Sequence, residues 1–154
     1  MWEEKLKKVQ SICDSLGLMD ITPAKPGAPS EVIDRWAEHV QKVLGTRPPE
    51  GYLKVLKAMN GFEWNGQILY GVDLCSFSIP PAYVGYGLIE QNEIWYEVEA
   101  QKAYLFLGEG SISWYVLEIA TGRYLELDNP SGREVDRFTG FDSLLERLLD
   151  NSLL

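Results

Sequence analysis

Residues 112–127 read ISWYVLEIATGRYLEL, and this stretch decides the fold class. It is rich in β-branched and aromatic residues, which is typical of strands. Segments 112–119 and 123–127 flank a short turn at residues 120–122, so the pattern predicts an antiparallel hairpin. Both faces of the first segment are largely apolar. We therefore expect it to be a central strand that is covered on both sides.

The segments on either side of this hairpin extend the prediction. Leucine and phenylalanine recur at helical spacing near the end of the chain, which predicts a C-terminal helix; they are Phe141, Leu144, Leu145, Leu148 and Leu149. Upstream, segments 103–107 and 67–74 are predicted strands, and residues 75–87 are a predicted loop. Residues 88–98 carry a weak helical stripe, so we predict a helix there; its positions are Leu88, Gln91, Asn92 and Trp95.

Three further helices are predicted before residue 61. The first covers residues 3–17, and a loop with three prolines follows at 20–29. The second begins at Ser30 as its N-cap and ends at Gly45. Its predicted buried face is Val32, Trp36, Val40, Val43 and Leu44. The third opens at residues 48–50 with two prolines and ends at Asn60 and Gly61, a pair suited to a left-handed exit.

This order of elements predicts an α+β fold, in which an antiparallel β-sheet is packed by N-terminal helices and a C-terminal helix. The length of 154 residues suits one domain, and no internal repeat or convincing boundary divides it. Hydrophobic residues make up 45% of the chain and charged residues 24%, a balance that excludes intrinsic disorder.

The formal charge of −9 is concentrated in the second part of the chain. Residues 1–60 carry nine Lys and Arg against eight Asp and Glu, whereas residues 61–154 carry five against fifteen. No Lys or Arg lies between Lys57 and Lys102. An acidic surface repels phosphate, so nucleic acid and anionic membranes are not expected partners, and a basic protein is a better one. An acidic balance also serves solubility alone.

The sequence offers little for metal or nucleophilic chemistry. His39 is the one histidine, and it lies at the edge of a helical apolar stripe, where we expect a half-buried side chain. Cys13 is expected in the core, and Cys75 ends a predicted strand. The two thiols could pair, but we expect both to be reduced and the protein to be cytoplasmic, since no secretion signal or membrane span is visible. No metal site and no cofactor are predicted.

Motifs of the common enzyme classes are absent. The sequence has no GxSxG and no Walker motif, and its two Gly-x-Gly pairs lack the third glycine of a dinucleotide fingerprint. A pair of carboxylates is the hardest device to exclude, because their separation cannot be read from sequence. A small carboxylate-dependent hydrolase therefore remains an alternative, and a binding protein is the first interpretation.

The candidate contact surface combines acidic and aromatic residues. Glu90, Glu93 and Glu97 share one face if 88–98 is helical, with Trp95 as an aromatic anchor nearby. The loop 75–87 adds aromatic side chains with almost no charge, although these rings could instead cap the sheet. The candidate partner-binding residues are Asp73, Tyr83, Tyr86, Glu90, Glu93, Trp95, Glu97 and Glu109.

Several short motifs carry a family resemblance in their order and spacing. They are PPEGY at 48–52, the pair Asn60-Gly61, FEWNGQILYG at 62–71, IEQNEIW at 89–95, YLFLGE at 104–109 and FDSLL at 141–145. Together they resemble the SMI1/KNR4-like (SUKH) superfamily, in particular its YrhA-like branch. The resemblance spans about residues 30–149 and leaves residues 1–29 outside. Pro48 departs from the pattern, which usually has an apolar residue there.

The resemblance implies a non-enzymatic binding fold. Many bacterial members of the superfamily are immunity proteins, each of which neutralises a cognate toxin, commonly a nuclease. An acidic immunity protein suits a basic nuclease, since opposite fields speed their encounter. A regulatory or scaffold interaction protein is the alternative within the superfamily. The family supplies no catalytic residues, its contact surface varies, and the oligomeric state is open.

Overall fold

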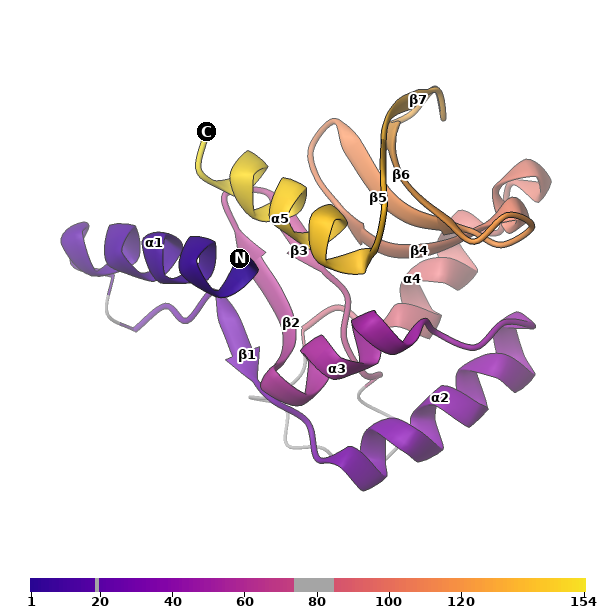
Figure 1. Cartoon of the computed structure of the whole chain (residues 1–154), viewed down its shortest axis with the longest axis horizontal. Coiled ribbons are helices and arrows are strands. Elements are labelled where there is room, and N and C mark those ends of the chain that lie inside the picture. The colour runs from indigo at the N-terminus through magenta and orange to yellow at the C-terminus, as the bar shows by residue number, and fades with distance from the viewer. Residues whose placement is uncertain (19, 74–84) are drawn as a thin grey trace.

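The computed structural model describes residues 1–18, 20–73 and 85–154. They form the predicted α+β fold, in which helices pack on a seven-stranded antiparallel sheet whose strands follow in chain order (Figure 1). The helices are α1 (Trp2–Ser15), α2 (Ser30–Leu44), α3 (Glu50–Ala58), α4 (Leu88–Trp95), the 3₁₀ helix η2 (Glu99–Ala103) and α5 (Phe141–Ser152). The strands are β1 (Ala24–Pro26), β2 (Met59–Trp64), β3 (Gln67–Leu69), β4 (Tyr104–Glu109), β5 (Ser113–Glu118), β6 (Arg123–Asp128) and β7 (Glu134–Phe138).

The hairpin predicted from residues 112–127 is confirmed as β5 and β6, which pair from Ser113 with Asp128 to Glu118 with Arg123. β5 is covered on both sides, also as predicted. On one side, Trp114 packs edge-on against Trp95 of α4, with ring centroids 5.4 Å apart. On the other side, the Tyr115 hydroxyl accepts a hydrogen bond from Asn151 of α5. The sheet is therefore enclosed between α4 and α5 at this point.

The first and last helices pack together against the sheet, and they lie side by side in Figure 1. Lys5 of α1 reaches α5, where its ammonium lies 2.8 Å from Asp150 and 3.5 Å from Glu146. Five apolar residues of α5 are buried, at the spacing predicted from the sequence: Phe141, Leu144, Leu145, Leu148 and Leu149. α5 thus closes the core that the helices before β2 begin.

The buried face of α2 differs from the predicted one. Ile33 and Ala37 are buried with Trp36 and Val40, whereas Val43 is 46% exposed. The buried face therefore keeps Trp36 and Val40 as predicted, with Val32 and Leu44 half-buried, and is turned toward Ile33 and Ala37 and away from Val43. Ser30 is the first helical residue, and Pro29 in extended conformation takes the N-cap position. Gly45 ends the helix in the left-handed region, as expected.

Four strands were missed or misplaced in the prediction. β1 lies in the stretch expected to be a loop, and β7 was not predicted. α3 passes without a loop into β2, because Met59 is already extended and Gly61, with a φ of 104°, lies inside the strand rather than at a helix exit. The strand predicted at 67–74 ends at Leu69 as β3, and residues 74–84 lie outside the described part of the chain.

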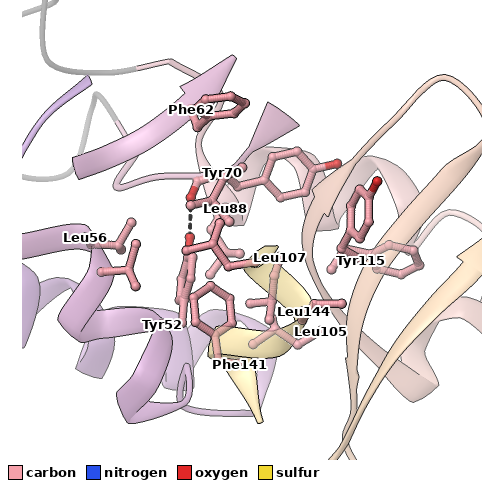
Figure 2. Close-up of a cluster of buried hydrophobic side chains, with 14 of the residues drawn as sticks. Tyr52, Leu56, Phe62, Tyr70, Leu88, Leu105, Leu107, Tyr115, Phe141 and Leu144 are labelled. Atoms are coloured by element: carbon pink, nitrogen blue, oxygen red, sulfur yellow. Dashed lines mark hydrogen bonds between the residues drawn. The ribbon is translucent and has the colours of Figure 1, made fainter. Parts of the chain in front are cut away.

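A tyrosine-rich core joins α3 to the sheet. Figure 2 shows the Tyr52 side chain of α3 directed at the segment after β3, where its hydroxyl donates a hydrogen bond to the Tyr70 carbonyl. Tyr52 and Tyr70 are both fully buried. Tyr52 also contacts Phe141 edge-on, at 5.4 Å between ring centroids. This contact packs α3 against the start of α5.

Asn92 fixes α4 to the sheet. It is fully buried, and its amide nitrogen donates to the carbonyls of Leu88 and Phe106 at 2.8 Å each. Its amide oxygen accepts from the Phe106 N–H at 2.8 Å. The side chain thus binds both backbone groups of a β4 residue, as a neighbouring strand would. It does so beyond Leu69, where β3 has ended.

Burial also predicts a loss of stability in alkali. It raises the pKa of both Tyr96 and Tyr115 to about 12, against roughly 10 for an ordinary tyrosine. The folded chain therefore favours the neutral phenols. Their contribution is complete below the pKa of the unfolded chain and is lost as pH rises toward about 12. Urea unfolding at stepped pH should show this decline. Full ionisation of all tyrosines near pH ~10 without loss of stability would contradict it.

Candidate functional site

The inner side of α4 is held by Asp73. This residue is 8% exposed, and its carboxylate accepts hydrogen bonds from the N–H groups of Ile89, at 3.1 Å, and Glu90, at 3.0 Å. It also accepts from the Trp36 indole of α2, at 2.9 Å. Asp73 therefore caps the start of α4 from a distance in sequence and ties it to α2. A Cβ on Gly87 would overlap this carboxylate, so glycine is required there.

The far end of α4 is anchored through Trp95. Its indole donates to the Tyr70 hydroxyl at 3.0 Å, and that hydroxyl donates to Glu109 at 2.9 Å. Burial, followed by the charge of Glu109, raises the pKa of Tyr70 well above its ordinary value, so Tyr70 remains a neutral donor. Trp95 also packs against Phe106. The Asp73 cap, the Asn92 side chain and the Trp95 indole together fix the inner side of α4. The opposite side of the helix therefore faces solvent in a fixed position.

This outward side of α4 and of the turn after it is acidic with an apolar centre. Glu90, Glu93 and Glu97 are exposed, Ile94 is 48% exposed and Val98 is 56% exposed. We call these five residues the acidic face. Glu90, Glu93 and Ile94 are at helical i, i+3 and i+4 spacing, which places them together on the surface. The helix ends at Trp95, so Glu97 and Val98 belong to the turn that follows rather than to a continuous helical stripe.

The acidic face lacks internal charge compensation. Within the described residues, Glu90, Glu93 and Glu97 form no ion pair. The nearest basic residue along the chain, Lys102, is 3.0 Å from Glu99. Unpaired carboxylates around exposed aliphatic side chains suit a partner with basic groups and an apolar contact.

The predicted contact residues divide into three groups. Glu90, Glu93 and Glu97 are exposed, as is Tyr86 at 40%. Trp95 and Glu109 are half-buried and bind Tyr70, so they support the face rather than form it. Asp73 is buried with its carboxylate bound internally, so its prediction as a contact residue is corrected to a structural role. Tyr83 lies outside the described residues.

Ile94 and Val98 were missing from the predicted site. Both residues are aliphatic and lie within the helix predicted over residues 88–98. Aliphatic residues in a helix are normally assigned to the core, so neither was considered a contact residue. A sequence signal existed, since Ile94 follows the buried Asn92 by two positions and so lies away from the inward stripe. The predicted stripe already included Asn92, so the outward position of Ile94 could have been derived from it.

Two cavities among the described residues hold carboxylates that are already bound, whereas a third, of about 570 Å³, has Asp142 as the one carboxylate in its lining. A cavity of about 330 Å³ contains Glu126, which accepts from Ser113 and Arg147. Another, of about 400 Å³, contains Asp128 and Glu134. Hydrogen bonds from Ser131 hold the pKa of Asp128 below its ordinary value, and Glu134 is paired with Arg137 at 2.9 Å. A lowered pKa is opposite to what a general acid requires.

Other candidate chemistry is sparse in the part of the chain that the structure covers. Cys13 is fully buried, and burial raises the pKa of its thiol, so it is poorly reactive. His39 is exposed on α2 rather than half-buried as expected, because the buried face of that helix is rotated. No group of three His, Cys, Asp or Glu among the described residues is arranged to hold a metal ion. None of the described helices has the length and apolar character to cross a bilayer.

Comparison with known proteins adds no family assignment. The chain matches no model of a known protein family and no curated protein. The resemblance to the SMI1/KNR4-like superfamily therefore stays a prediction made from the motifs themselves. A functional proposal has to rest on the acidic face and on the charge of the chain.

Proposed function

We propose that this chain is a non-enzymatic protein-binding module, and that it acts as an immunity protein which neutralises a basic, nuclease-type toxin. The acidic face is the contact surface. One observation carries the proposal: exposed Ile94 and Val98 lie among three glutamates that have no ion-pair partner in the described residues. The motif resemblance supports the toxin as the class of partner.

The charges of the face match the surface of a nuclease. A nuclease binds phosphate through Lys and Arg, and these are the groups that unpaired carboxylates attract. Ile94 and Val98 then supply the apolar area that holds the complex after encounter. A protein bound in this way would cover the phosphate-binding surface of the nuclease, so inhibition needs no catalytic group on this chain.

Charge reversal at Glu93 and Glu97 tests the proposal. The variant Glu93→Lys/Glu97→Lys is expected to abolish partner binding, with association slowed by about tenfold or more at low salt. Both side chains are exposed and unpaired among the described residues, so the melting temperature should not fall. Binding is measured by pull-down from lysate and from the secreted fraction of the source cells, at low and high salt.

The matched control is Glu3→Lys/Glu4→Lys, which makes the same change of charge on exposed positions of α1. Its binding should stay close to wild type. A single basic nuclease that is lost at high salt, and whose toxicity this chain relieves, supports the proposal. Equal loss of binding in both variants would contradict the proposal, because it would show a non-specific effect of charge rather than a contact at the acidic face. Several weak partners would favour a regulatory or scaffold protein.

A further inference from the structure

A second surface feature lies at the end of α5, on the side of the sheet opposite α4. It is a cavity of about 330 Å³ between the start of β3, the loop before β5 and the C-terminus of α5. This volume is near the lower end for small-molecule sites. Its lining is polar with two aliphatic side chains, and it consists of Asn65, Gln67, Ser111, Ile112, Ser113, Glu126, Asn151 and Leu154.

A directed chain of hydrogen bonds ends in this cavity. The Asn151 amide nitrogen donates to the Tyr115 hydroxyl at 2.8 Å, and that hydroxyl donates to the amide oxygen of Gln67. The direction of these bonds leaves the Gln67 amino group as the last donor. It has no acceptor among the described residues, although Gln67 is only 7% exposed and lines the cavity. The amino group faces the cavity and is therefore available to a ligand that enters it.

The opposite wall of the cavity favours an uncharged ligand. The Glu126 carboxylate accepts from Ser113 at 2.7 Å and from Asn151 at 3.3 Å. Arg147 neutralises its charge at 2.9 Å. The paired carboxylate therefore has no free charge to attract a cation, and it has no hydrogen to donate to an anion. The Asn151 amide oxygen forms no hydrogen bond with a described residue and provides a neutral acceptor.

We propose that this cavity binds a carboxamide, the neutral group of an asparagine or glutamine side chain or of a small amide. The carbonyl of the ligand accepts from the Gln67 amino group, and its amide N–H donates to the Asn151 oxygen. Ile112, which is 71% exposed, and Leu154, which is 93% exposed, cover the aliphatic part of the ligand. Such a pairing of one donor with one acceptor is specific for an amide over a carboxylate or an amine.

Two probes of equal size test the proposal. Butyramide carries the carboxamide, and butyrate replaces it with a carboxylate. Titration of the ¹⁵N-labelled protein with butyramide is expected to shift the side-chain resonances of Gln67 and the backbone resonances of Ser111 and Ile112 in a saturable way. A ligand this small should bind with millimolar affinity. Butyrate should bind at least about tenfold more weakly.

Gln67→Glu is the informative variant. It keeps an oxygen for the Tyr115 hydroxyl and replaces the amino donor, so butyramide affinity should fall by about tenfold or more. Gln101→Glu makes the same exchange on η2, outside the cavity, and should leave the affinity unchanged. If Gln67→Glu fails to fold, Ser111→Trp fills the cavity from an exposed position and should abolish the shifts.

A blocked asparagine, N-acetyl-asparagine methylamide, separates the two sources of the ligand. Tighter binding than butyramide indicates a peptide, and weaker binding indicates a free small amide. Equal shifts with butyramide and butyrate, or butyramide shifts unchanged in both Gln67→Glu and Ser111→Trp, would overturn the proposal. None of these outcomes depends on the acidic face.

Discussion

Replacing Asn92 with leucine is expected to lower the free energy of unfolding by about 2–5 kcal/mol, because it leaves two buried backbone groups without partners. The Phe106 N–H and carbonyl both bind the Asn92 side chain, and among the described residues no strand lies beside them to replace these hydrogen bonds. Leucine has a similar volume, so loss of hydrogen bonds rather than loss of packing would account for the decrease. Urea unfolding followed by circular dichroism measures it.

The neighbouring residue provides the control. Gln91→Leu makes the same kind of exchange on α4 at a half-buried position, where the structure gives the side chain no hydrogen bond to a described residue. Its effect should stay within about 0.5 kcal/mol. Asn92→Asp should also destabilise, since aspartate can still accept from Phe106 N–H but cannot donate to its carbonyl. A leucine variant as stable as wild type would show that α4 does not depend on this contact.

Arg147→Met is expected to lower the free energy of unfolding by about 2–3 kcal/mol. Arg147 of α5 binds Glu126 of β6 at 2.9 Å and Asp136 of β7, and it lies over the Phe138 ring at 5.4 Å. Glu126 is almost fully buried, so methionine leaves a carboxylate without its cation. Because a third of the arginine side chain is exposed, we expect less than the loss of a fully buried pair.

A second substitution identifies the cause. Glu126→Gln in the Arg147→Met background removes the uncompensated charge and should recover part of the lost stability. Arg137→Met breaks an exposed pair with Glu134 on the same strand and should cost less than about 1 kcal/mol. Thermal unfolding of the wild type, Arg147→Met, Arg147→Met/Glu126→Gln and Arg137→Met compares their stabilities directly. If the double variant is no more stable than Arg147→Met, the loss is one of packing against Phe138 and not of charge.

The elements with strong local patterns could be predicted from the sequence. α5 has an unbroken apolar stripe, and β5 with β6 has apolar residues on both faces around a short turn. β7 could not be predicted in this way. Its sequence Glu134–Phe138 carries three charged residues and little burial, because it is an edge strand that pairs with β6 through its backbone. β1 contains Pro26 and three residues in all, too few for a pattern.

The acidic face was predictable in part. Charge and spacing pointed to Glu90, Glu93 and Glu97 before the position of α4 was known. The roles of Asp73 and Asn92 were not, because a polar residue in sequence gives no sign of a buried backbone partner. Asp73 acts on N–H groups sixteen and seventeen positions away. Such contacts depend on where the sheet brings the chain back.

The strand order of the sheet also has a consequence for how the chain folds. From β4 to β7 each strand pairs with the next one in the chain, so each new pairing closes a short loop at little entropic cost. These four strands form a low contact-order unit, which favours rapid assembly. The packing of α1 on α5 joins residues as far apart as Lys5 and Asp150 and has the largest closure entropy. We therefore expect docking of α1 to be a late step, after the four strands are already in register.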